Sequence, residues 1–205
     1  MSVFISFEGG EGSGKTSVID LLYRDLLDKG FDVLRTREPG GSKISEEIRN
    51  IILNINNVEM DYRTEALLYA ASRRQHLVEV IIPALKSGKI VLCDRYLDAS
   101  LAYQGHARGL GIDEIYKINQ YATDGILPEL TFFIDVKPET GLSRIKDSGR
   151  VMDRLDLERN SFHHLVREGY LSVAAMFPKR IHIIDGNRDL EIIHQEIKEQ
   201  ILKIL

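Results

Sequence analysis

The sequence predicts an α/β fold in which helices flank a five-stranded parallel sheet. Short apolar runs alternate with longer segments of helical periodicity along the 205 residues. A glycine-rich loop joins the first apolar run to the first helical segment, and the third run is apolar at nearly every position, as in a central parallel strand. Strands that alternate with helices form parallel sheets covered on both faces, so we expect a single domain over residues 1–205.

The first predicted elements follow from the apolar pattern and the residues that interrupt it. A strand at 4–7 precedes a helix at 17–29, which Gly30 closes as a C-terminal cap. A second strand at 32–36 stops at residues 37–41, because their sequence Arg-Glu-Pro-Gly-Gly cannot continue a strand or begin a helix.

The central part of the chain predicts a short helix at 45–53 and a long one at 62–86, whose end Pro83 disturbs. The apolar run at 89–94 is the third strand. The remaining predicted elements are helices at 97–103 and 113–123, a strand at 131–136, a helix from Pro138, a helix at 161–176, a strand at 181–185 and a helix at 190–205. Proline suits the first turn of a helix, where its missing N–H costs nothing.

The loop between the first strand and helix matches the phosphate-loop pattern G-x-x-x-x-G-K-[ST] at every fixed position. Its glycines let the backbone N–H groups point at phosphate oxygens, and the following helix adds the positive end of its dipole. Lys15 can reach the β- and γ-phosphates, and the Thr16 hydroxyl can coordinate Mg²⁺. The alternative, a glycine-rich turn that binds nothing, is disfavoured by the strand and helix on either side. The residues predicted to bind ATP here are Gly9, Gly10, Glu11, Gly12, Ser13, Gly14, Lys15, Thr16 and Ser17.

Asp94 and Arg95 follow the third strand at the sheet edge that faces ligands in such folds. Asp94 is well placed to hold the hydration shell of Mg²⁺ opposite Thr16, and Arg95 to face a phosphate. The alternative is a simple ion pair between Asp94 and a basic neighbour.

Arginine also collects at this predicted edge. Arg37 follows the second strand, and Arg73 lies on the long helix. Taken alone, Arg37 is explained by an ordinary turn and Arg73 by a solvent-exposed helix face. Together with Arg95 they indicate a second anion site, and therefore a phosphorylated substrate besides ATP.

Residues 144–159 are dense in charge and contain a flexible Ser148-Gly149 pair. Most such runs are solvated corners with local ion pairs. Beside a phosphate loop, an arginine-rich segment also predicts a lid that closes over the triphosphate and supplies arginines to the transition state.

Composition narrows the function classes. The net charge of −4 disfavours general nucleic-acid binding. No apolar run approaches the ~20 residues that span a bilayer, and Met1-Ser2 leads straight into a strand without a signal-peptide pattern. The one cysteine, Cys93, lies in an apolar run and is expected to be a buried core residue. We expect a cytoplasmic protein with no nucleic-acid or membrane partner.

The chain resembles the thymidylate kinases along nearly its whole length. The phosphate loop alone is shared by many folds, whereas the second-loop and Asp-Arg-Tyr blocks are much more specific in this order and spacing. The matching blocks are residues 7–16, 36–41 (Thr-Arg-Glu-Pro-Gly-Gly), 47–49, 63–68, 71–74, 94–96 (Asp-Arg-Tyr), 100–105 (Ser-Leu-Ala-Tyr-Gln-Gly) and 154–156.

This resemblance implies a phosphate-loop nucleoside monophosphate kinase fold with an arginine-rich lid. It implies transfer of a phosphoryl group from ATP to dTMP, giving dTDP for dTTP synthesis, with Mg²⁺. It also implies a homodimer formed through helices. Glu11 followed by Gly12 resembles the bacterial subgroup, in which the lid supplies the catalytic arginine.

The resemblance also implies roles for individual residues at matching positions. Lys15, Arg95, Arg150 and Arg154 match catalytic positions, with Arg154 the more direct match of the two lid arginines, and Arg144 resembles a residue that packs on adenine. Tyr69 matches the residue that stacks on thymine, and Tyr103 the one that crowds the sugar 2′ position. The full set expected to bind the acceptor is Glu11, Arg37, Glu38, Pro39, Arg49, Tyr69, Arg73, Arg95, Ser100, Tyr103 and Gln104, with Thr16 and Asp94 as the metal site.

Two alternatives stay open at this point. The nearer is a kinase for another nucleoside monophosphate, such as UMP or CMP, although Tyr103 and the Ser100/Gln104 pair argue against it. The farther is a nucleotide-dependent switch, but the Asp-x-x-Gly and Asn-Lys-x-Asp motifs of guanine-specific switches do not occur.

Overall fold

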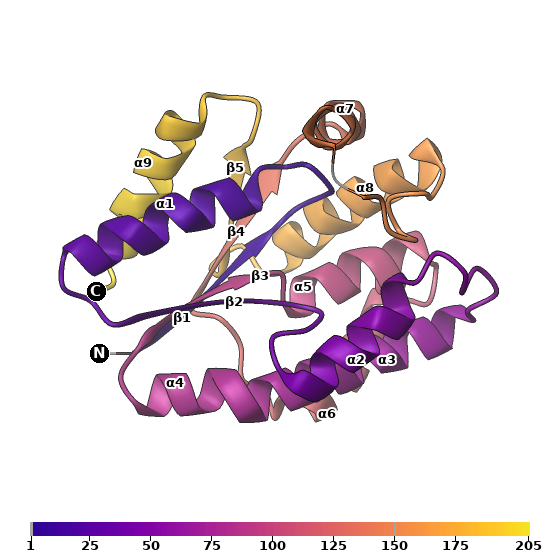
Figure 1. The fold of residues 1–205 in the computed structure, drawn as a ribbon, viewed down its shortest axis with the longest axis horizontal. Helices are drawn as coiled ribbons and strands as arrows, with labels where there is room; N and C mark the ends of the chain where they lie inside the picture. Colours follow the sequence, from indigo (N-terminus) through magenta and orange to yellow (C-terminus); the bar gives the residue numbers. More distant parts are fainter. Residues whose placement is uncertain (1, 150) are drawn as a thin grey trace.

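The computed structural model describes residues 2–149 and 151–205, and it contains the predicted five-stranded parallel sheet. The strand order is β2-β3-β1-β4-β5, so β1 is central and β3 and β4 flank it (Figure 1). The strands are β1 (Val3–Glu8), β2 (Val33–Arg37), β3 (Ile90–Asp94), β4 (Leu130–Asp135) and β5 (Ile181–Asp185). All the strands run in one direction, so their carboxyl ends meet at one edge of the sheet.

Helices cover both faces. They are α1 (Lys15–Asp28), α2 (Lys43–Leu53), α3 (Tyr62–His76), α4 (Ile82–Lys86), α5 (Leu97–Ser100), α6 (Ile112–Thr123), α7 (Pro138–Ser148), α8 (Asn160–Met176) and α9 (Leu190–Leu202). Figure 1 shows α1 and α9 together on one side of the sheet, and α4 with the α2, α3 and α6 group on the other. Among the described residues, no helix is both long and apolar enough to cross a bilayer.

The alternation of side chains along β1 explains the two layers. Ile5 and Phe7 pack in a core cluster with α1 and α9, whereas Phe4 packs in a second cluster with α3, α5 and α8. Successive residues of a strand point to opposite faces, so a nearly all-apolar strand supplies both cores at once. Cys93 is buried in the second cluster, as predicted.

The long predicted helix at 62–86 is confirmed as one continuous path with a π-helical stretch, η1 (Leu77–Ile81), between α3 and α4. Pro83 explains the wider turn, because it lacks an N–H and its ring crowds the carbonyl four residues earlier. A second π-helical stretch, η2 (Leu101–Ala107), extends the predicted helix at 97–103 and was not foreseen. The last helix ends at Leu202 and not at residue 205.

Candidate active site

The phosphate loop lies between β1 and α1, as predicted. Gly14 adopts the left-handed conformation (φ 92°) as the residue before α1, which a side chain would disfavour. Lys15 is 5% exposed, and its Nζ donates to the carbonyl oxygens of Gly9 and Gly10, both at 3.0 Å, and to Ser13 Oγ at 3.1 Å. Burial, and then the nearby Arg95 charge, lower the pKa of Lys15 to about 8. The loop therefore presents a desolvated ammonium group to a phosphate.

Thr16 and Asp94 face each other across the sheet edge. Thr16 Oγ1 donates to Asp94 Oδ2 at 2.9 Å, and Asp94 Oδ1 is buried without a hydrogen-bond partner. One carboxylate and one hydroxyl suit Mg²⁺, which takes oxygen ligands and keeps several waters and substrate phosphates in its shell. The described residues contain no cluster of three or more acidic, histidine or cysteine side chains that could hold a metal. The residues present therefore fit a magnesium ion delivered with a nucleotide.

Two cavities meet beside this loop. The first, which we name the donor cavity after the predicted ATP site, is bordered by residues 11–17 of the loop, by Asp94 and by α7. The second, which we name the acceptor cavity after the predicted acceptor site, is lined by residues of α2, α3 and η2. Four residues line both cavities, namely Glu11, Glu38, Arg49 and Arg95. This boundary is the place where a group could pass from one bound molecule to the other.

Arg95 is the central residue of that boundary. Its backbone is left-handed (φ 67°), and its NH2 donates to Glu11 Oε1 at 2.6 Å. Tyr103 also donates to Glu11 Oε1, at 3.0 Å, and the Arg95 guanidinium lies over the Tyr103 ring. Although burial alone would lower it, Glu11 and the neighbouring tyrosines keep the pKa of Arg95 well above its usual value. The guanidinium is therefore a permanent positive charge between the cavities.

Arg73 forms a rigid wall of the acceptor cavity. It is 1% exposed, and its guanidinium donates to Glu38 at 2.7 Å, to Ser100 Oγ at 3.0 Å and to the Tyr96 carbonyl at 2.9 Å, with a further bond to Asn119. A planar guanidinium held on several sides keeps one orientation. The predicted acceptor residues that line this cavity are Glu11, Glu38, Pro39, Arg49, Tyr69, Arg73, Arg95, Ser100, Tyr103 and Gln104.

Arg37 is the exception in the predicted acceptor set. It lines the donor cavity, and its NH2 donates to both oxygens of Glu46 at 2.9 Å. Its NH1 donates to the Pro39 carbonyl at 2.7 Å, an oxygen that Arg49 also reaches at 2.9 Å. Arg37 and Arg49 thus brace the second loop on the phosphate side.

The amino-terminal half of the predicted lid lies on the donor cavity. Arg144 and Ser148 of α7 line it, and both Arg144 NH groups lie 3.4 Å from the Gly186 carbonyl. Helix α7 also touches the phosphate loop directly. A Cβ placed on Gly141 would lie 2.1 Å from the Glu11 carbonyl oxygen, and one on Gly12 would lie 2.0 Å from the Gly141 carbonyl oxygen.

The two predicted lid arginines differ. Arg150 lies outside the described residues. Arg154 is buried and does not lie among the described residues that line either cavity. Its Nε donates to the Ile52 carbonyl at 2.8 Å, and its NH2 donates to Glu65 Oε2 at 2.5 Å. This arrangement does not bring Arg154 to the phosphate loop, because the buried Glu65 carboxylate holds the guanidinium.

Several residues of the site were not found by sequence reasoning. Asp153 and Leu155 line the acceptor cavity, Glu65 bonds the side chains around it, and Glu8 accepts a hydrogen bond from the Tyr96 backbone at 2.7 Å. Glu8 ends an apolar run, and a carboxylate at that place was the available signal. Glu65 stands beside other polar residues in the sequence, so nothing marked it as buried.

The comparisons with known proteins agree with this geometry. The family model "Thymidylate kinase" matches residues 7–197. The thymidylate kinase of Geobacillus sp. (strain WCH70) is 61% identical over 92% of this chain and 90% of its own. That of Oceanobacillus iheyensis is 55% identical over 99% and 91%.

Among solved structures, the thymidylate kinase from Ehrlichia chaffeensis superposes with a TM-score of 0.78 at 33% identity, covering 98% of both chains. The family model and these relatives extend over nearly the whole chain. The chain belongs to the thymidylate kinase family.

Proposed function

We propose that this chain transfers the γ-phosphoryl group of ATP to the phosphate of dTMP, giving dTDP and ADP in the synthesis of dTTP. Family membership supports the reaction class and the acceptor. The observation that carries the geometry is the boundary at which Glu11 and Arg95 line both cavities. Two nucleotides bound in these cavities would meet there with their phosphates.

The donor nucleotide occupies the cavity along residues 9–17 in this proposal. The loop amides and the Lys15 ammonium hold its phosphates, and Arg144 packs on its adenine. Thr16 and Asp94 hold Mg²⁺, which neutralises charge on the phosphate oxygens when it is bound. Within the described residues, Asp94 Oδ1 accepts no hydrogen bond and has only the Arg95 guanidinium at 4.0 Å, which supports this assignment.

The acceptor occupies the other cavity. Tyr69 stacks on the base, Arg73, Ser100 and Gln104 contact its ring edge, and Tyr103 lies near the sugar. Arg95 and Arg49 offset the charge of the acceptor phosphate, so that two anions can approach in line. Holding the reactants together in this way can supply several kcal/mol, ~7–11 in favourable cases.

The catalytic arginine from the lid is Arg150 in this proposal, because Arg154 is occupied by Glu65. Arg150 follows α7, whose residues already line the donor cavity.

A panel of acceptors tests the function. The purified protein is supplied with ATP and magnesium, and ADP release is measured with dTMP, dUMP, dCMP, UMP and CMP. We expect turnover to depend on an acceptor and to be fastest with dTMP. Equal or greater rates with UMP or CMP would favour a kinase for another nucleoside monophosphate. Slow ATP turnover that does not change with any acceptor would favour a nucleotide-dependent switch.

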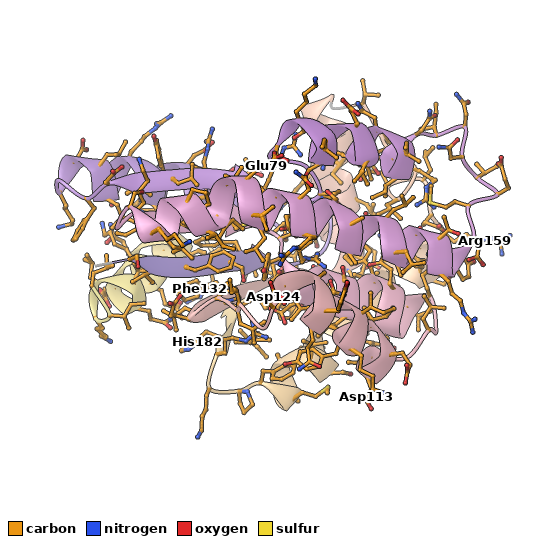
Figure 2. The ribbon with its side chains drawn as sticks, turned by 90° about the horizontal axis from the view of Figure 1, so that it is seen from below. Glu79, Asp113, Asp124, Phe132, Arg159 and His182 are labelled. Atoms are coloured by element: carbon orange, nitrogen blue, oxygen red, sulfur yellow. The ribbon has the colours of Figure 1, made fainter. Side chains whose placement is uncertain are left out.

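We also propose a cytoplasmic homodimer that uses the outer faces of α3 and α6. These helices lie at the front of Figure 2, where Asp113 and Asp124 mark the two ends of α6. Leu67 on α3 is 56% exposed and Tyr121 on α6 is 89% exposed, and two hollows are lined by residues of both helices. Sedimentation should give twice the monomer mass, and Leu67→Glu should give monomers. A monomeric wild-type chain would exclude this part of the proposal.

A further inference from the structure

Glu65 is a fully buried carboxylate at the amino-terminal end of α3, and it joins three separate segments of the chain. It accepts hydrogen bonds from Gln104 Nε2 of η2 at 2.8 Å, from Arg108 Nε and NH2 at 3.2 Å, and from Arg154 NH2 at 2.5 Å. We call Glu65, Gln104, Arg108 and Arg154 the Glu65 cluster.

The cluster is built around an ionised carboxylate. Burial alone would raise the pKa of Glu65, but the bonds from Arg108, Gln104 and Arg154 outweigh it and lower the pKa. Arg108 also pairs with Glu158 at 2.7 Å and stacks on Phe162. Two guanidinium groups are thus matched by two carboxylates, which is the condition for burying charges without a large cost.

The Glu65 cluster fixes the orientation of the Gln104 amide, which borders the acceptor cavity. Gln104 lines the acceptor cavity and commits its Nε2 to Glu65, whereas no donor within residues 2–149 and 151–205 meets its Oε1. An ionised carboxylate only accepts hydrogen bonds, so it must face the amide nitrogen of Gln104. The Gln104 amide therefore cannot turn over, and its carbonyl oxygen stays on the side away from Glu65. That oxygen suits a base whose ring nitrogen carries a hydrogen, as in thymine or uracil, and repels the bare ring nitrogen of cytosine.

The same carboxylate holds the segment that closes the acceptor cavity. Arg154 lies between Asp153 and Leu155, and both of these line the cavity. Its backbone N–H donates to the Leu53 carbonyl at 3.2 Å, so the segment is tied to both α2 and α3. An Arg154 that joined the phosphates would have to give up Glu65.

We propose that Glu65 is a positioning residue for the acceptor base: it orients the Gln104 amide and anchors Arg154, so that the cavity selects a base with a hydrogen on the ring nitrogen. Arg154 is then the anchor of this wall and not a group in the transition state. The inference rests on the proposed function and adds a determinant of its specificity.

The test compares the full-length wild-type chain with Glu65→Gln and Glu65→Asp, using kcat/KM for dTMP and for dCMP. In Glu65→Gln, the new amide can pair with the Gln104 amide in either orientation of Gln104. In Glu65→Asp, the carboxylate keeps its charge but lies farther from Gln104, because the side chain is one methylene shorter. We expect the dTMP:dCMP ratio of kcat/KM to fall at least about tenfold in both variants, since one mismatched buried hydrogen bond costs about that much. Calorimetry without ATP should show the same loss in dTMP affinity.

Glu158→Gln is the matched control, because it removes a carboxylate from the same Arg108 without touching Gln104. It should keep the wild-type ratio. A purely structural role for Glu65 would lower the active fraction equally for every acceptor, so an unchanged ratio in a folded variant overturns the inference. Should Glu65→Gln fail to fold, Glu65→Asp decides. A wild-type chain that does not phosphorylate dTMP would refute the proposed function, whatever the variants do.

Discussion

Gly141 allows α7 to lie against the phosphate loop, and its replacement by alanine tests whether that contact matters. The new Cβ would lie 2.1 Å from the Glu11 carbonyl oxygen, whereas ordinary contacts begin at 3.4 Å. Both partners are backbone, so no flexible side chain can yield. The helix and the loop must separate by about 1 Å, a displacement that can reduce a reaction rate about 10²-fold when it misplaces reacting groups.

The cost should appear on the donor side. Helix α7 carries Arg144 and Ser148 into the donor cavity, while Glu11 is the one residue of this contact that also lines the acceptor cavity. We expect Gly141→Ala to lower kcat/KM for ATP about 10²-fold and to lower dTMP affinity much less. Alanine favours a helix interior by about 1 kcal/mol over glycine, so the effect cannot be attributed to a weaker α7.

Initial rates at saturating dTMP, with ATP varied, measure this effect. Ser143→Ala is the matched control, because Ser143 is exposed on the same helix and the change likewise favours helix. It should behave as wild type. Wild-type kcat/KM for ATP in Gly141→Ala would refute the argument that the close contact positions α7.

Three further predictions concern buried ionisable groups. Lys15→Met should leave the fold nearly intact and abolish turnover, because it fills the same space without the charge; activity in that variant would exclude the phosphate role, and circular dichroism checks the fold. The pKa of Lys15, lowered to about 8 by burial, predicts that kcat/KM for ATP falls as pH rises through about 8, where the free enzyme loses its ammonium charge; a profile that stays flat to higher pH would contradict it. Burial, and then Asp98, raise the pKa of Glu8 from 4.5 to about 8, so the folded state holds this proton more tightly than the unfolded state. The stability contributed by Glu8 is complete below pH 4.5 and is lost as pH rises through about 8. Between pH 6 and pH 9, the free energy of unfolding from chemical denaturation should therefore fall more for wild type than for Glu8→Gln; equal decreases would count against this prediction.

The fold was predictable because its signals are local. Each strand is a short apolar run, and the phosphate loop and Pro138 mark helix starts by their backbone chemistry. The π-helical stretches η1 and η2 were not predictable. The first depends on how the helix accommodates Pro83, and the second on how η2 packs against α8.

The site was predictable where a motif fixes the neighbours. Lys15 and Thr16 end the phosphate-loop motif at the start of α1, and Asp94 ends a neighbouring parallel strand. The fold brings these two places to the same edge of the sheet. Arg154 was not, because a charge run does not say which buried carboxylate will accept its guanidinium. Glu65 lies on α3, and Arg154 meets it only because the turn that carries Arg154 packs against α2 and α3.

The central claim is that two nucleotides bind at once, in cavities that share Glu11 and Arg95. Calorimetric titration of dTMP into the magnesium-supplied protein, first alone and then saturated with a non-hydrolysable ATP analogue, measures this directly. The account predicts one dTMP bound per chain in both titrations, with affinity retained when the analogue is present. Displacement of one nucleotide by the other would mean a single shared site and would contradict it.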